Sequence, residues 1–341
     1  MSGGGIASGG GTASGRSVAS SRDTAGTRGD RLDRVPWGAV ALFVVVAYAL
    51  AWLIILPLWL SPELLASPLS GVFPAAMMFA PALAAVAALF LARTPRTRRL
   101  EFLGMWPLRP AKRTIWFAVG TVFAPTVIVL ASVFLSAAFG WVRLDLVNFS
   151  GFAATLAAST PPEALDLLPP VQLLALVQLL AIPINSLFVS VLAFGEEIGW
   201  RGWLLPALRP LGTWPALILS GAIWGLWHTP VTLLGHNYGL TDWRGVALMT
   251  VSCVLLGIVL GWTRLRTGSV WPAVFGHGAW NASGSVLLVL ASAGDTLNTV
   301  LGGPMGVGGW IVLAVIIVVL AATGQFRKQP PLGALRPARP L

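Results

Sequence analysis

The stretch Trp37–Leu60, WGAVALFVVVAYALAWLIILPLWL, contains no charged side chain. An α-helix needs about 20 predominantly apolar residues to cross the hydrocarbon core of a bilayer, so this run is long enough to span a membrane. Similar runs follow near residues 70–92, 114–140, 184–208, 213–230, 243–263, 268–291 and 307–323. The sequence therefore predicts an all-α fold, a polytopic transmembrane helix bundle with about eight spans.

The composition supports a membrane protein. Hydrophobic residues make up 56% of the chain, charged residues only 10%, and the mean hydropathy is +0.81, well above the values of a soluble globular domain. The single cysteine, Cys253, excludes an intrachain disulfide and a cysteine-based metal site. The net charge of +10 comes mainly from arginines between the apolar runs and at the two ends, which indicates anchoring beside an anionic membrane face rather than binding of nucleic acid.

The connections between the runs alternate in charge. The connection 93–113 is rich in Arg and Lys, whereas the connections 61–69, 231–242 and 292–306 contain neither. Positive charge favours the cytoplasmic side of a membrane. We therefore predict an integral membrane protein, in the plasma membrane of a prokaryote, with both termini in the cytoplasm.

The ends of the chain differ from the spans. Residues 1–34 are rich in Gly, Ser, Ala and Thr and have few large apolar side chains, so we expect a disordered cytoplasmic tail. Residues 326–341, with several prolines and basic residues, predict a second cytoplasmic tail. The transmembrane domain is expected to occupy residues 35–325.

Two adjacent carboxylates occur in the run Phe194–Arg201, FGEEIGWR. Ionisable residues inside a membrane are costly and commonly functional. Helical spacing of four residues lets Glu197 pair with Arg201. Glu196 projects about 100° away from Glu197, so it is free to face a cavity.

Two of the three histidines also fall inside predicted spans, His228 in WGLWHTP and His277 in FGHGAWN. The spacing of four places Asn281 on the same helical face as His277. If a helix break at Pro183 makes 184–208 the spanning helix, with 171–182 a separate short helix near the outer face, the depths of Glu196, His228 and His277 are similar. They lie roughly 20, 22 and 16 Å along their helices from the predicted cytoplasmic surface.

These side chains form a sufficient set for peptide hydrolysis. A carboxylate and an imidazole can activate a water molecule, while an amide and a second imidazole donate hydrogen bonds to a developing oxyanion. Glu196, His228 and His277 could alternatively hold a zinc ion with an open position. The HExxH pattern of many zinc peptidases is missing from the sequence, so both chemistries stay open.

Three motifs, Glu-Glu-x-x-x-Arg at 196–201, aromatic-x-x-x-His at 224–228 and His-x-x-x-Asn at 277–281, resemble those of a known family. This is the CAAX protease and bacteriocin-processing family of intramembrane peptidases, which includes the type II CAAX prenyl endopeptidase. The resemblance covers a peptidase-like core at about 180–285. Trp224 stands where the family often has Phe.

The resemblance implies a role for each matched residue. Glu196 and His228 would activate the water, His277 and Asn281 would stabilise the oxyanion, and Glu197 and Arg201 would support the site. Such an endopeptidase, metallopeptidase or glutamate-type, would cut a membrane-associated peptide or protein that is CAAX-like or bacteriocin- or leader-like. We expect the site to open toward the cytoplasm.

Three other interpretations compete with this one. The buried charges could form a structural ion pair that fixes helix packing. Glu196, His228 and His277 could be the proton relay of a proton-coupled transporter. The chain could also be a non-catalytic membrane partner or an immunity protein.

Overall fold

The computed structural model describes residues 32–294 and 297–327, so nearly all of both predicted tails lies outside the described residues. Within these residues the chain is helical and no strand longer than the single bridge between Leu144 and Ala291 occurs. The prediction of an all-α fold is confirmed. The helices are α1 (Trp37–Leu60), α2 (Pro62–Ala66), α3 (Val72–Met77), α4 (Ala80–Phe90), α5 (Arg99–Phe102), α6 (Ala111–Ala138), α7 (Ser150–Ser159), α8 (Pro162–Leu165), α9 (Val171–Glu197), α10 (Leu205–Leu208), α11 (Thr213–Trp227), α12 (Thr229–Thr232), α13 (Trp243–Thr267), α14 (Trp271–Ala282), α15 (Val286–Leu290), α16 (Thr299–Gly302) and α17 (Val307–Ala322).

Seven helical segments of the described chain are long and apolar enough to cross a membrane. An eighth predicted span, 213–230, corresponds to α11, which has 15 residues and is therefore only about 22 Å long. A hydrocarbon core is about 30 Å thick. The observed helices thus agree with about eight spans, one of which is short and ends inside the bundle.

The predicted helix break at Pro183 is wrong. Helix α9 runs without interruption from Val171 to Glu197 through this proline, so 171–182 is not a separate short helix. A proline removes one N–H donor from a helix. The Pro183 carbonyl itself keeps a partner, because the Ser186 hydroxyl donates to it at 2.6 Å. Because a membrane offers the backbone no other hydrogen-bond partners, a helix tolerates a proline there better than in water.

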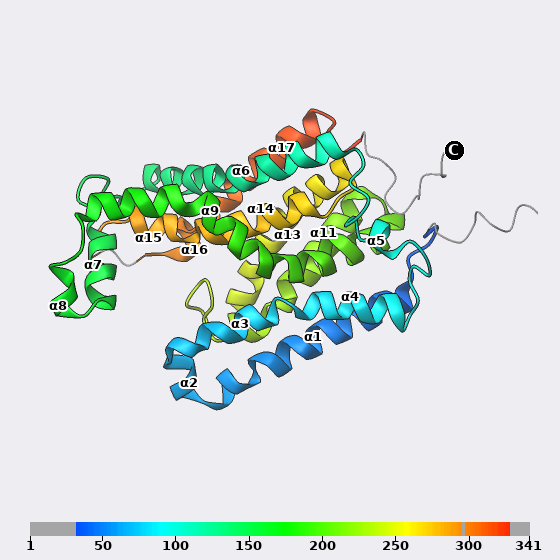
Figure 1. Cartoon of the computed structure of the whole chain (residues 1–341), viewed down its shortest axis with the longest axis horizontal. Helices are drawn as coiled ribbons and strands as arrows, with labels where there is room; N and C mark the ends of the chain where they lie inside the picture. Colours follow the sequence, from blue (N-terminus) through cyan, green and yellow to red (C-terminus); the bar gives the residue numbers. More distant parts are fainter. Residues whose placement is uncertain (1–31, 295–296, 328–341) are drawn as a thin grey trace, which may run out of the picture.

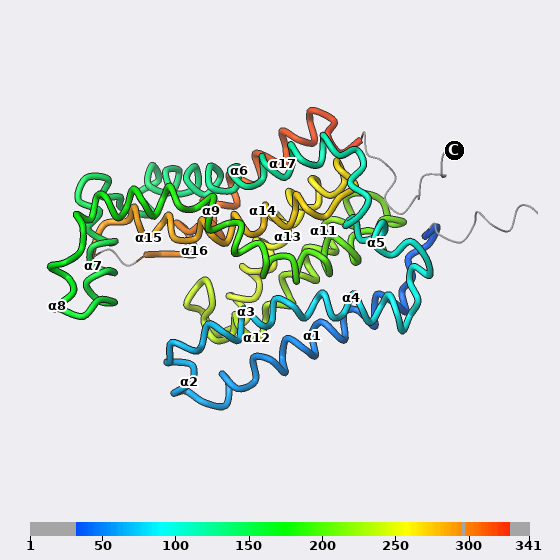
Figure 2. Tube along the Cα trace, viewed as in Figure 1, coloured from blue at the N-terminus to red at the C-terminus, as the bar shows by residue number. Residues whose placement is uncertain are grey.

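The helices form two groups (Figures 1 and 2). Helices α1, α3 and α4 run side by side as one layer, and α6, α9, α11, α13, α14 and α17 form the larger group. Helix α5, in the basic connection 93–110, lies at one end of the bundle, which we call the basic end. Helices α2, α7, α8 and α15 lie at the other, which we call the opposite end.

Glycines bring the central helices close together. A Cβ atom on Gly221 of α11 would lie 2.7 Å from the Cα atom of Val254 on α13. One on Gly195 of α9 would lie 2.7 Å from the carbonyl oxygen of Met78, which directly follows α3. Small residues at such contacts allow the backbones of membrane helices to approach, and here they place the polar side chains of several helices around one space.

Candidate active site

Both glutamates lie in the last turn of α9, directly before a π-helical segment, Ile198–Leu204. The side chains of Glu196 and Glu197 are buried, at 2% and 0% exposure. A π-helix is a rare, wider turn that occurs frequently at functional sites. The wide turn includes Arg201, so it sets how this side chain meets its partner.

Glu197 is bound by an arginine and a histidine. Its Oε1 accepts a hydrogen bond from Arg201 Nη1 at 2.6 Å and lies 2.9 Å from His277 Nδ1. The predicted pair between Glu197 and Arg201 is confirmed, and the structure adds His277 to it. Since a carboxylate oxygen only accepts hydrogen bonds, His277 Nδ1 must carry the proton of this contact.

Glu196 is held by neutral donors instead. Its Oε2 accepts hydrogen bonds from the indole Nε1 atoms of Trp224 at 2.6 Å and Trp200 at 3.2 Å. Its other oxygen, Oε1, takes no part in these two bonds. The two adjacent carboxylates therefore have different environments, one ionic and one neutral.

His228 ends α11, and its ring is oriented by that helix. Its Nδ1 lies 2.9 Å from the Trp224 carbonyl oxygen. A carbonyl oxygen only accepts, so this contact needs the proton on Nδ1, and the neutral ring then presents an unprotonated Nε2. An imidazole in this state can accept a proton from water.

Trp224 lies at the centre of the cluster. Its ring stacks under the Arg201 guanidinium at 4.3 Å and meets the His277 ring edge-on, with the ring centroids 5.3 Å apart. Together with its hydrogen bond to Glu196, these contacts let one tryptophan connect the ionic and the neutral parts of the site.

A cavity of about 540 Å³ brings the predicted site residues together. Glu196, His228, His277 and Asn281 all line it, whereas Glu197 and Arg201 lie behind its wall. This separation agrees with the expected division into four residues that face the substrate and two that support them.

The cavity extends toward the opposite end of the bundle. Its lining includes His236 and Asn237 from the connection before α13, and Thr299 and Met305 from the segment before α17. The connection 93–110 contributes no lining residue. The lined space around Glu196 therefore extends away from the basic end, while the opening of the site toward the cytoplasm stays a prediction.

The residues present do not fit the predicted zinc site. Among the described residues, no three His, Cys, Asp or Glu side chains converge closely enough to hold a metal ion. Glu196 Oε2 is already bonded to Trp224, and His277 Nδ1 is already bonded to Glu197. We therefore derive no step through a metal.

The sequence analysis did not predict three residues that contact the predicted site residues. Trp200 and Trp224 donate to Glu196, and Cys253 Sγ lies 3.8 Å from His228 Nδ1. One signal was present: Trp200 follows Glu196 by four residues, and an indole N–H inside a membrane needs an acceptor. No such spacing links Trp224 to Glu196 or Cys253 to His228.

The fold and the site define a class, a polytopic helical membrane protein with a buried carboxylate and two histidines around one cavity. Comparison with known proteins is consistent with this class. The model of a family described as type II CAAX prenyl endopeptidase Rce1-like matches residues 175–283, a region that contains all six predicted site residues. The family resemblance seen in the three motifs is confirmed over this region.

One curated relative is similar to part of the chain. CAAX prenyl protease 2 of Methanococcus maripaludis is 28% identical over 115 residues, which is 32% of this chain and 42% of the relative. The similarity thus spans less than half the length of that relative.

Proposed function

We propose that this protein is an intramembrane endopeptidase that hydrolyses a peptide bond of a membrane-associated substrate. The observation that carries the proposal is the convergence of Glu196, His228, His277 and Asn281 on one cavity. The similarity to a family of CAAX endopeptidases over the same residues supports it.

The first step is activation of water. A water molecule between Glu196 and the unprotonated Nε2 of His228 would lose a proton to this pair as its oxygen attacks the peptide carbonyl carbon. The indoles of Trp200 and Trp224 fix Glu196 by neutral hydrogen bonds. These bonds orient the carboxylate that would accept the proton.

The second step is stabilisation of the tetrahedral oxyanion. The Asn281 side-chain amide would donate one hydrogen bond, and His277 would donate another from Nε2 in its doubly protonated form. The contact between His277 Nδ1 and Glu197 leaves Nε2 as the ring nitrogen that can make this bond. The proton taken from water then passes to the leaving amine as the carbon–nitrogen bond breaks.

Glutamate-type chemistry follows from the side chains without a metal, and this is the mechanism that we propose. A metallopeptidase would lose its activity on treatment with a chelator and regain it on addition of zinc. Cleavage that is unchanged by chelator, together with less than stoichiometric zinc in the purified protein, is the result that we expect.

The substrate class follows from the relative's name and from the surroundings of the site. The Methanococcus protein is named for CAAX prenyl proteolysis, and the cavity of this chain lies among membrane-spanning helices. We therefore propose as substrate a peptide held at the membrane, either a CAAX-like tail or a bacteriocin- or leader-like segment.

The decisive experiment compares Glu196→Gln with Glu63→Gln, in which the replaced glutamate lies exposed in α2. Both purified proteins are incubated in detergent with a library of apolar peptides, and the products are identified by mass spectrometry. We expect cleavage by the wild type and by Glu63→Gln, and none by Glu196→Gln, with equal melting temperatures. Cleavage by Glu196→Gln at the wild-type rate would exclude the mechanism, and the absence of any product from the wild type would favour a transporter or a non-catalytic partner.

A further inference from the structure

The residues that line the cavity lie toward one end of the bundle. On α9 the cavity is lined by Leu192 and Glu196, and on α13 by Met249, Cys253 and Leu256. Helix α9 runs from the opposite end toward the basic end, and α13 runs the same way. These lining residues lie on the stretch of each helix between the level of Glu196 and the opposite end.

The rim of the cavity is formed by connections at the opposite end. His236 belongs to the connection 233–242, and Leu297, Thr299 and Pro304 belong to the segment before α17. The two segments contact each other, since the Tyr238 hydroxyl donates to the Met305 carbonyl at 2.9 Å. Both are segments without Lys or Arg.

On its other side the site is closed by packed side chains. Trp200 and Trp203 are fully buried, and Arg201 is 2% exposed. Arg264, which is 1% exposed, donates from Nε to the Arg201 carbonyl at 3.0 Å and from Nη2 to the Phe102 carbonyl at 2.8 Å. These buried and hydrogen-bonded side chains form a packed layer between the site and the basic connection.

Hydrogen bonds hold the basic connection against residues 269–271. The Gly104 carbonyl accepts hydrogen bonds from Val270 N at 3.0 Å and Ser269 Oγ at 3.1 Å. The indole of Trp271 donates to the Met105 carbonyl at 3.1 Å. The basic connection is thus held against the packed end of the bundle.

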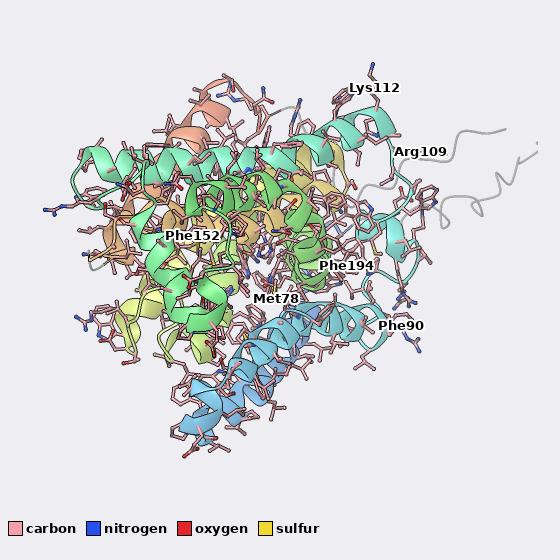
Figure 3. The ribbon with its side chains drawn as sticks, turned by 60° about the vertical axis from the view of Figure 1, so that its left-hand side comes forward. Met78, Phe90, Arg109, Lys112, Phe152 and Phe194 are labelled. Atoms are coloured by element: carbon pink, nitrogen blue, oxygen red, sulfur yellow. The ribbon has the colours of Figure 1, made fainter. Side chains whose placement is uncertain are left out.

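In Figure 3, Arg109 and Lys112 are labelled on one side of the molecule and Phe152 of α7 on the other. Arg109 and Lys112 mark the basic end, which the positive-inside rule assigns to the cytoplasm. The open end then faces away from the cytoplasm.

The lining also limits the chemistry of what can enter. Of the residues that line the cavity, only Glu196 is an Asp, Glu, Lys or Arg, and the others include Met77, Met78, Leu256 and Trp280. Apart from Glu196 and the histidines, the lining offers no partner to offset the hydration that a charged group would lose, whereas apolar side chains would be transferred favourably.

We infer that the site is loaded from the end opposite the basic connection, and that it takes an uncharged, apolar peptide segment exposed on the non-cytoplasmic face of the membrane. This inference rests on the proposed peptidase function and specifies the substrate by the side from which it arrives. Translocated leader or signal-like segments have this chemistry, and a cytoplasmic CAAX-like tail would have to reach the site from the basic end.

The first test uses sealed membrane vesicles of both orientations that contain the full chain. A peptide that is cleaved in detergent is given charged ends, so that it cannot cross the membrane, and is added outside the vesicles. We expect cleavage in right-side-out vesicles and its loss in inside-out vesicles, with equal activity after both are opened by detergent. Cleavage only in inside-out vesicles would overturn the inference while leaving the peptidase function intact.

A second test does not depend on catalysis. In a Cys253→Ala background, the exposed residues His236 and Lys112 are replaced one at a time by cysteine and treated with a membrane-impermeant maleimide. We expect His236→Cys to react in right-side-out vesicles and Lys112→Cys in inside-out vesicles. The reverse pattern would overturn the inference even if no peptide is ever found to be cleaved.

The two tests can be joined. Labelling His236→Cys places a bulky group at the rim and is expected to reduce cleavage relative to the same protein before labelling. Labelling Lys112→Cys, at the basic end, is expected to leave cleavage unchanged. Equal inhibition by both labels would contradict loading through the rim.

Discussion

The adjacent glutamates Glu196 and Glu197 have different surroundings. Glu197 lies behind the cavity wall, between Arg201 and His277. Glu196 faces the cavity and is held by two indole N–H groups. A carboxylate bound by an arginine and a histidine behind the wall is suited to support, whereas one that faces the cavity and is bound by two indoles is placed to meet a water molecule.

The strongest way to test this comparison is to remove one carboxylate at a time. We expect Glu196→Gln to lower kcat by about 10³-fold or more, because the general base is lost, while its melting temperature in detergent stays near that of the wild type. We expect Glu197→Gln to lower both kcat and the melting temperature. The comparison fails if the two variants have the same profile of activity and stability.

The ionic part of the site can be tested through its arginine. Replacing Arg201 by Ala leaves Glu197 buried without its closest partner, and breaking a buried pair in this way costs about 3–5 kcal/mol. We expect a clear loss of thermal stability. Arg98→Ala is the matched control, because the Arg98–Glu101 pair, 2.6 Å apart, is partly exposed and should contribute at most about 1 kcal/mol.

The neutral part depends on Trp224, which can be replaced by the Phe that is frequent at this position in the family it resembles. Trp224→Phe keeps an aromatic ring beside Arg201 but removes the Nε1 donor to Glu196. A hydrogen bond to a charged group contributes about 1.5–3 kcal/mol, so we expect kcat to fall by about tenfold or more. The control is Trp203→Phe, which removes a bond to the Thr94 carbonyl and should leave kcat unchanged.

The smallest expected effect concerns Cys253. Its sulfur lies 3.8 Å from His228 Nδ1, whereas the Trp224 carbonyl lies at 2.9 Å. We therefore expect Cys253→Ala to change kcat by less than about twofold and to cost only about 1 kcal/mol of stability through the small cavity created. A large loss of activity would mean that the thiol, and not the carbonyl, orients His228.

Much of the fold could be predicted because each span is a local property of the chain. The long apolar runs correspond to helices that differ by only a few residues at their ends, as for Trp37–Leu60 and α13. The break at Pro183 was predicted wrongly, because proline disfavours helices in water and the membrane reverses the balance. The shortness of α11 was also missed, since it depends on His228 ending the helix inside the bundle.

The sequence by itself determined the membrane-spanning character, the charge of the connections and the pair between Glu197 and Arg201. These depend on composition and on helical period, which act over a few residues. Only the tertiary structure decided that His277 meets Glu197, 80 positions away in the chain, that Trp224 meets Glu196, and that the cavity extends away from the basic end. Such contacts depend on how each helix is rotated against its neighbours, which is set by close packing at glycines such as Gly195 and Gly221.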